Sequence, residues 1–304
     1  RTLESLPYKK KKGLQGIIFP IQRVLLLTNI YVSIGAGCLC YACIKIQGIT
    51  NNLHHVLISM LYVLSMHILN NLIGTKADRY NDPDRSSFYD KNRTLLGFLA
   101  LTAGGIGLMI AYSAGWIPFL ILFGMSLMGL YYNVRIIPKR LAYDKYLRLR
   151  DIPGSKTVLI AMAWGIVTSF LPQLGESGNI HLDTAIIFLW SLSLVFVRTA
   201  FFDILDMQGD RIVGKETIPI LVGEKRALRH LKVILAINFG ILFVSSAFQL
   251  IPGLGFLLLI CPAFVFIMLS AHERGYMLPG IRLEFLVESN FVMAGVMTLV
   301  WSLF

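Results

Sequence analysis

The stretch TAIIFLWSLSLVFVRTAFFDILDMQGD, residues 184–210, contains the two features that decide the fold. It begins as an almost unbroken apolar run and ends with three aspartates. A helix of about 20 apolar residues can cross a hydrocarbon layer of roughly 30 Å. The stretch therefore predicts a membrane-spanning helix with a cluster of acids at one end.

Comparable apolar runs recur along the whole chain. Of its 304 residues, 56% are hydrophobic and only 15% are charged, whereas soluble domains contain about 25% charged residues. Helices satisfy their backbone hydrogen bonds internally, as the lipid interior requires. We therefore expect one all-α, polytopic membrane domain over 1–304, with a basic arm at about 1–20, and neither a soluble fold nor a membrane β-barrel. Nine spans are expected, at about residues 21–46, 53–74, 94–113, 116–134, 156–173, 183–202, 230–250, 253–271 and 285–304.

The positive charges predict how the spans are oriented. The formal net charge is +11, and among the 28 Lys and Arg residues only Lys45 lies on the side opposite to the amino-terminal arm in a nine-span topology. Cytoplasmic loops of membrane proteins are enriched in Lys and Arg. We therefore expect the amino terminus and the acid-rich loops in the cytoplasm and the carboxyl terminus on the other side. Because membrane orientation already explains the excess of basic residues, we do not expect nucleic acid as a partner.

The acids that follow residues 183–202 are spaced for one helix face. Asp203, Asp206 and Asp210 stand at i, i+3 and i+7, so they share a face if the helix continues through Gly209. Mg²⁺ favours oxygen ligands and commonly combines one or two carboxylates with phosphate oxygens. The pattern is typical of a metal–diphosphate site, with a solvated interfacial loop as the alternative.

A second polar stretch, HILNNLIGTKADRYNDPDR at 67–85, leaves another span on the same expected side. Asn70, Gly74 and Asp78 stand at successive i+4 positions there, so two helix ends can face one pocket. Asp82, Asp84 and Asp90 follow, but Pro83 interrupts the helical spacing. We interpret these three acids as surface residues.

These two regions resemble the UbiA superfamily of intramembrane prenyltransferases, which has nine spans and an aspartate-rich motif after the second and the sixth. The second motif matches well, because GKETIPILVG at 214–223 follows the three aspartates. The first motif keeps Asn70 and Asp78 but has Asn71 and Gly74 where the family usually has aspartates. The resemblance therefore implies that the first metal site is weaker or absent.

The resemblance implies transfer of an isoprenyl group from an allylic or polyprenyl diphosphate to a membrane-accessible acceptor, with a quinone precursor among the candidates, by Mg²⁺-assisted ionisation. It implies that the catalytic acids and metal ligands are Asp78, Asp203, Asp206 and Asp210. The implied substrate-binding residues are Asn70, Asn71, Lys76, Arg79, Tyr131, Arg135, Arg198, Arg211 and Lys215. The depleted first motif leaves an alternative: a non-catalytic UbiA-like subunit that binds quinone, pigment or lipid within a larger membrane complex.

Glu288 and Asn290 are polar residues near the start of the last expected span. Polar groups at membrane depth suggest a functional role, and these two could help to place an acceptor. Because they lie near the interface, we favour a structural role for them.

Overall fold

The computed structural model describes residues 14–50, 53–74, 76–132, 152–277 and 279–304, and in these ranges the chain is helical without any strand. The helices are α1 (Leu14–Leu27), α2 (Ile30–Ile46), α3 (Leu53–Ile73), α4 (Lys76–Asn81), α5 (Pro83–Lys91), α6 (Arg93–Ala114), α7 (Trp116–Tyr131), α8 (Ser155–Gly165), the π-helix η2 (Ile166–Phe170), α9 (Leu171–Glu176), α10 (Leu182–Leu205), α11 (Met207–Ile212), α12 (Ile218–Val222), α13 (Glu224–Ala247), α14 (Leu254–Leu258), α15 (Ile260–Glu273) and α16 (Ile281–Trp301).

Seven segments of the described chain are long and apolar enough to cross a membrane. They are α3, α6, the continuous run from α8 to α9, α10, α13, the run from α14 to α15, and α16. The bent pair α1–α2 raises the number to eight, and α7 is a shorter apolar helix of 16 residues. The expected all-helical membrane fold is confirmed, whereas the expected nine spans are not.

The bend between α1 and α2 has a local cause. Asn29 adopts a left-handed conformation with φ of 58°, and the two helix axes turn by 75° at this break. Its side-chain amide donates a hydrogen bond of 2.6 Å to the hydroxyl of Tyr89 on α5. The same contact therefore fixes the direction of α1 and attaches α5 to the bundle.

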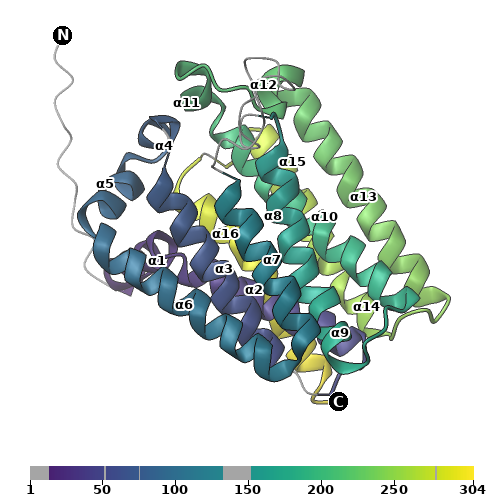
Figure 1. Cartoon of the computed structure of the whole chain (residues 1–304). Coiled ribbons are helices and arrows are strands. Elements are labelled where there is room, and N and C mark those ends of the chain that lie inside the picture. Colours follow the sequence, from purple (N-terminus) through teal and green to yellow (C-terminus); the bar gives the residue numbers. More distant parts are fainter. Residues whose placement is uncertain (1–13, 51–52, 75, 133–151, 278) are drawn as a thin grey trace, which may run out of the picture.

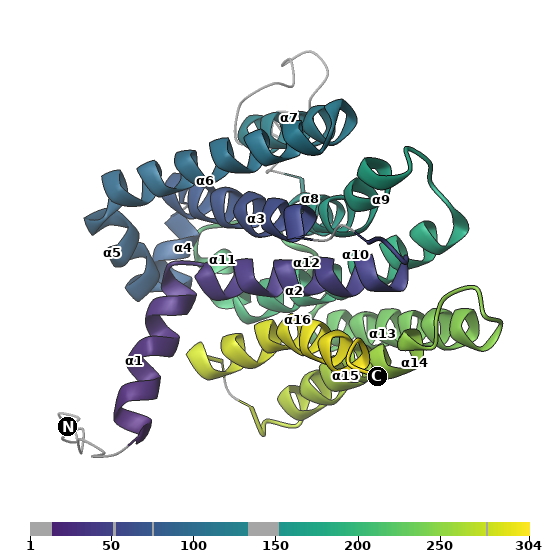
Figure 2. The same cartoon turned by 90° about the horizontal axis from the view of Figure 1, so that it is seen from below.

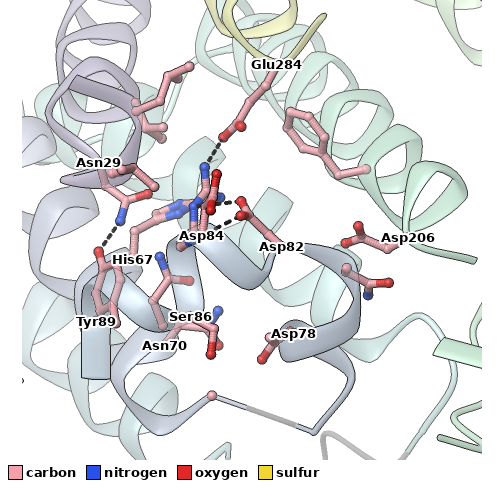
Figure 3. A pocket seen from close by; sticks show the side chains of 18 of the residues that line it. Asn29, His67, Asn70, Asp78, Asp82, Asp84, Ser86, Tyr89, Asp206 and Glu284 are labelled. Carbon is pink, nitrogen blue, oxygen red and sulfur yellow. Dashed lines mark hydrogen bonds and ion pairs between the residues drawn. The ribbon is translucent and has the colours of Figure 1, made fainter. Parts of the chain in front are cut away.

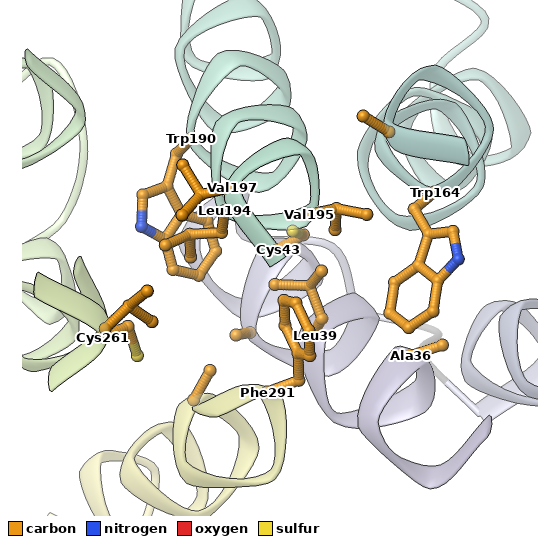
Figure 4. Packing of buried hydrophobic residues seen from close by; sticks show 14 of the residues in the cluster. Ala36, Leu39, Cys43, Trp164, Trp190, Leu194, Val195, Val197, Cys261 and Phe291 are labelled. Atoms are coloured by element: carbon orange, nitrogen blue, oxygen red, sulfur yellow. The ribbon is translucent and has the colours of Figure 1, made fainter. Parts of the chain in front are cut away.

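The long helices pack around α2, which runs through the middle of the bundle (Figure 2). On one side lie α3, α6 and α7, and on the other lie α16 and α13 to α15. The helices α2 and α16 approach closely, because a Cβ atom on Gly295 would lie only 2.6 Å from Cβ of Cys38. Trp164, Trp190 and Phe291 fill the core between the helices (Figure 4).

Short helices gather at one end of this bundle. The helices α4, α11 and α12 lie together there, while α9, α14 and the carboxyl terminus lie towards the opposite end (Figure 1). Both acid-rich stretches therefore occupy the same end of the molecule, which is where the candidate site is found.

Candidate active site

A cavity of about 770 Å³ opens at the end of the bundle that carries α4. Its wall is built from α1 to α6, α8, α10 and α16, and Figure 3 shows part of this wall. Residues of both acid-rich stretches line it, including Asp78 from the first and Asp203 and Asp206 from the second. The meeting of two helix ends at one pocket, expected from the sequence, is therefore observed.

The first stretch does not continue as a single helix. Gly74 ends α3 with φ of +33°, a backbone conformation that disfavours side chains larger than glycine. Asn70 and Asn71 remain on the last turn of α3, whereas Asp78 lies on the separate helix α4. The position of Asp78 relative to Asn70 is therefore set by the break between α3 and α4 and not by the i+4 spacing through Gly74. Asp78 Oδ2 would lie 4.0 Å from a Cβ placed on Gly74.

Two of the three acids in the second stretch face the cavity. Asp203 lies in the last turn of α10, and its Oδ2 accepts a hydrogen bond of 2.5 Å from the hydroxyl of Thr157 on α8. Asp206 follows the last residue of α10. Burial raises the pKa of Asp206 to about 7, although the positive charge of Lys156 opposes the shift. A cation bound beside this carboxyl would stabilise its charged form, which burial away from water disfavours.

Asp210 is held away from the cavity by other partners. Its side chain is 1% exposed and is not part of the cavity wall. Lys215 Nζ lies 3.2 Å from Oδ2, and Asn81 Nδ2 donates to Oδ1 at 3.2 Å. The shared helix face expected from the i, i+3 and i+7 spacing therefore gives only two cavity-lining acids.

Gly209 brings the two acid-rich stretches into direct contact. A Cβ atom at this position would lie 1.9 Å from Oδ1 of Asn81 and 3.2 Å from Cβ of Tyr80, both on α4. Only glycine therefore allows α4 and α11 to pack this closely. Since Asn81 also bonds to Asp210, this packing fixes Asp78 relative to the acids of the second stretch.

Ion pairs form the rim of the cavity. Arg85 on α5 pairs with Glu284 on α16 at 2.5 Å and with Asp82 at 3.4 Å. More exposed pairs join Asp84 to Arg23 and Asp90 to Arg79, at 2.6 and 4.0 Å. The interpretation of Asp82, Asp84 and Asp90 as surface residues is therefore incomplete, because all three also line the cavity.

An apolar cavity of about 90 Å³ adjoins the large one. The two share His67, Asn70, Ile73, Lys156 and Ile160. Its other walls come from α3, α7 and α8 and are mostly apolar. A charged headgroup and an apolar tail could thus bind side by side.

The substrate-binding residues expected from the sequence separate into three groups. Those that line the large cavity are Asn70, Asn71, Arg79 and Arg198. Those that lie elsewhere are Tyr131, which is 52% exposed at the end of α7, Arg211, which is exposed, and Lys215, which contacts Asp210. Arg135 and the side chain of Lys76 lie outside the described part of the chain.

Lys156 is a cavity residue that the sequence analysis missed. It lines both cavities, and its charge acts on the carboxyls of Asp203 and Asp206. It lies in the first turn of α8, where the helix dipole disfavours a cation. This unfavourable position of a cation could have pointed to Lys156, but in the sequence Lys156 resembles the other positive charges beside the spans.

The sequence profile of the UbiA prenyltransferase family matches residues 30–277. The chain belongs to this family. A digeranylgeranylglyceryl phosphate synthase of Halobacterium salinarum is 28% identical over 247 residues, which cover 76% of this chain and 79% of the relative. A protein of the same name from Pyrococcus horikoshii is 28% identical over 197 residues, 62% of each chain.

Solved structures of UbiA homologues share the fold. The apo structure of a homologue from Aeropyrum pernix K1 has a TM-score of 0.63 at 14% identity, over 90% of this chain and 99% of that one. A homologue from Archaeoglobus fulgidus bound to GPP and Mg²⁺ has a TM-score of 0.63 at 18% identity, over 92% and 99%. The bundle described above is thus the fold of the UbiA family.

The oxygen donors of the cavity suit a hard divalent cation. Asp78, Asp203 and Asp206 offer carboxylates, which Mg²⁺ prefers. Within the described ranges, no three Asp, Glu, His or Cys side chains are grouped closely enough to hold a metal ion by themselves. This arrangement fits a cation that takes only one or two carboxylates and completes its shell with phosphate oxygens and water.

Proposed function

We propose that this UbiA-family protein is a Mg²⁺-dependent intramembrane prenyltransferase. It would move an isoprenyl group from an allylic or polyprenyl diphosphate to a membrane-accessible acceptor. The observation that carries the proposal is the single cavity lined by Asp78 from α4 and by Asp203 and Asp206 from the end of α10. Structures of a UbiA homologue from Archaeoglobus fulgidus bound to GPP and Mg²⁺ and to DMAPP and Mg²⁺ support the same substrate class.

The charges of the cavity suit a leaving diphosphate. Breaking the carbon–oxygen bond leaves its electron pair on the diphosphate, so positive groups at that end lower the barrier. Bound Mg²⁺ would supply most of this charge by coordinating the phosphate oxygens. One or two of the carboxylates of Asp78, Asp203 and Asp206 would coordinate the cation, and Lys156 would contact the diphosphate. Asp210 would join them only if it exchanged its contacts with Lys215 and Asn81.

The apolar cavity would hold the isoprenyl chain next to the bond that breaks. Its wall includes Met66, Met125 and Trp164. Such a lining excludes water, which would otherwise capture the electron-poor allylic carbon. Asn70 lines both cavities and would orient the substrate where its polar head meets its apolar tail.

Binding and transfer test the proposal in sequence. The full chain in detergent should bind a non-hydrolysable thio analogue of geranyl diphosphate with Mg²⁺, and chelation should weaken binding at least tenfold. Geranyl and geranylgeranyl diphosphate should then be offered with aromatic quinone precursors and with glyceryl phosphate lipids. The latter are included because the relatives are named digeranylgeranylglyceryl phosphate synthases. Binding that is equal with and without Mg²⁺ would contradict the proposal.

A non-catalytic subunit is the second candidate function. Asn71 and Gly74 favour it, because neither supplies a carboxylate, and Gly74 in its left-handed conformation cannot be replaced by Asp without strain. Such a subunit would bind quinone, pigment or lipid within a membrane complex. Tight binding of the diphosphate analogue without product from any acceptor, together with copurification of partner subunits, would favour it.

We further propose a nine-span topology in which the bent pair α1–α2 and the short helix α7 each count as one span. The amino terminus and the cavity would then face the cytoplasm. A cysteine introduced at exposed Arg79 should react with a membrane-impermeant maleimide only from the cytoplasmic side, whereas one at exposed Phe304 should react only from the opposite side.

A further inference from the structure

His67 is a base at the junction of the two cavities. It lies on α3, and its side chain lines both the large cavity and the apolar cavity (Figure 3). Among the residues in the described ranges, none forms a hydrogen bond with its imidazole ring. One nitrogen of an uncharged imidazole carries a lone pair that can accept a proton. The ring is therefore available to a substrate that occupies the cavities.

The junction of the cavities is where the donor substrate would react. If the diphosphate occupies the large cavity and the isoprenyl chain the apolar one, the carbon–oxygen bond between them crosses the junction. The residues that line both cavities are His67, Asn70, Ile73, Lys156 and Ile160. Two of these side chains are aliphatic, the amide of Asn70 is not a base, and Lys156 is a cation. Among these five residues, His67 is therefore the one base.

The carboxylates of the site are less suited to accept a proton there. Asp78 lies on α4, beyond the end of α3, and Asp203 and Asp206 lie at the end of α10. A helix rises about 1.5 Å per residue, so His67 lies about 9 Å inside the end of α3. A carboxylate that coordinates Mg²⁺ also shares its charge with the cation and is a poorer base. The acids therefore suit the diphosphate end of the donor, and His67 suits the carbon that reacts.

The surroundings of His67 suit a base better than a phosphate contact. Its ring meets the ring of Trp164 edge to face, with centroids 6.1 Å apart and an angle of 76° between the planes. This contact holds the imidazole against an apolar part of the wall. Lys156 and Arg198 already bring positive charge to the large cavity, so a further cation is not needed there. An ordinary imidazole is largely uncharged at neutral pH and can then accept a proton.

Building on the proposed function, we propose that His67 is the catalytic base that takes the proton released by the acceptor. The carbon–oxygen bond of the donor breaks and leaves its electron pair on the diphosphate. The acceptor forms a new bond to the allylic carbon through an oxygen or an aromatic carbon, and the proton of that atom passes to a ring nitrogen of His67. The imidazolium lies beside the leaving diphosphate, whose negative charge stabilises it. The proton leaves with the diphosphate, which restores the uncharged ring.

Chemical modification of the histidines tests where His67 lies relative to the donor. Diethyl pyrocarbonate reacts with uncharged imidazoles, and mass spectrometry of peptides reports each histidine separately. In the full chain in detergent at neutral pH, Mg²⁺ with the thio analogue of geranyl diphosphate should slow modification of His67 at least tenfold. Mg²⁺ with inorganic pyrophosphate, which lacks the isoprenyl chain, should slow it less than threefold. Exposed His54 and His230 are internal controls whose rates should not change.

Variants then assign the proton transfer to His67. With the acceptors offered in the test of the proposed function, His67→Asn should lower kcat about 100-fold or more, as expected for a lost general base. Its affinity for the diphosphate analogue should change less than twofold. Added imidazole should restore part of the rate of His67→Ala, because it can occupy the space left by the ring. His230→Asn, the same substitution at an exposed position, is the matched control and should keep the wild-type rate.

Three results would overturn the assignment of His67. One is protection by pyrophosphate as strong as protection by the analogue, which would make His67 a diphosphate contact. Another is a wild-type kcat in His67→Asn, or a His67→Ala variant whose rate imidazole does not raise. The third is a loss of affinity for the analogue in His67→Asn as large as the loss of rate. A wild-type protein that binds no analogue, or that prenylates none of the acceptors, would instead reject the proposed function and the role of His67 with it.

Discussion

Replacing Gly209 with alanine should uncouple the two acid-rich stretches. The new Cβ would lie 1.9 Å from Oδ1 of Asn81, whereas carbon and oxygen atoms normally stay at least about 3.3 Å apart. The side chain of Asn81 can rotate away, but it then loses its bond to Asp210. The contact of 3.2 Å to Cβ of Tyr80 remains, but a small movement of α4 can relieve it. The main effect is the loss of the bond between Asn81 and Asp210, which releases α4, and Asp78 with it, from α11.

The expected loss follows from the freedom of movement that α4 and Asp78 then gain. A displacement near 1 Å can cost about 100-fold in an active site, so we expect Gly209→Ala to weaken Mg²⁺-dependent binding of the thio analogue by about 10- to 100-fold. Overpacking should also lower the free energy of unfolding by about 1–3 kcal/mol. Titration calorimetry measures the first effect, and thermal unfolding in detergent measures the second.

Two controls isolate the contact between Gly209 and Asn81. Gly105→Ala on α6 is the matched control, because a Cβ there meets open space, and it should leave binding unchanged. In an Asn81→Ala background, Gly209→Ala should cost less than about threefold, since only the contact with Tyr80 remains. Additive losses in this double-mutant cycle, or normal binding by Gly209→Ala alone, would refute the packing argument.

The pKa of Asp206 is raised to about 7, and the carboxyl must lose its proton before it can bind Mg²⁺. The apparent Mg²⁺ affinity should therefore rise with pH, by up to about tenfold per pH unit below pH 7. Calorimetry between pH 6 and 8 should show this slope, and a flat profile would exclude Asp206 as a ligand. Because the folded protein binds this proton more tightly than the unfolded chain, the contribution of Asp206 to stability falls as pH rises from about 4 to about 7. Asp206→Asn should therefore raise the unfolding temperature at pH 8 while abolishing Mg²⁺-dependent binding, and a lower unfolding temperature would contradict the burial argument. Lys156→Gln removes a positive charge that contacts the diphosphate in the proposed site, so it should weaken diphosphate binding about tenfold or more. The same charge lowers the pKa of Asp206, so the variant should also need a higher pH for the same Mg²⁺ affinity. Unchanged diphosphate affinity would remove Lys156 from the site.

The helical membrane fold could be predicted because it depends on residue composition over long windows. The run at 184–200 becomes part of α10, and two of the three acids that follow it face a cavity. The number of spans was harder to predict, because hydropathy does not register the 75° bend at Asn29 or the short length of α7. Both are local backbone features rather than changes in composition.

Side-chain partners set the limit for predicting the site. The spacing of Asp210 is that of a ligand, yet it contacts Lys215 and Asn81, and a periodic pattern carries no information about such partners. Asn81 also matters through its contact with Gly209, which joins residues that are far apart in sequence. Arg85 and Glu284 at the rim depend in the same way on packing between α5 and α16.

The most direct test of the shared metal–diphosphate site replaces Mg²⁺ with paramagnetic Mn²⁺. Electron–nuclear double resonance on the protein with Mn²⁺ and the thio analogue should show ³¹P couplings from the diphosphate. Asp78→Asn and Asp206→Asn should each weaken or abolish them. Couplings that persist unchanged in both variants, or Mn²⁺ bound without any ³¹P coupling in the wild-type protein, would contradict a site shared by α4 and α10.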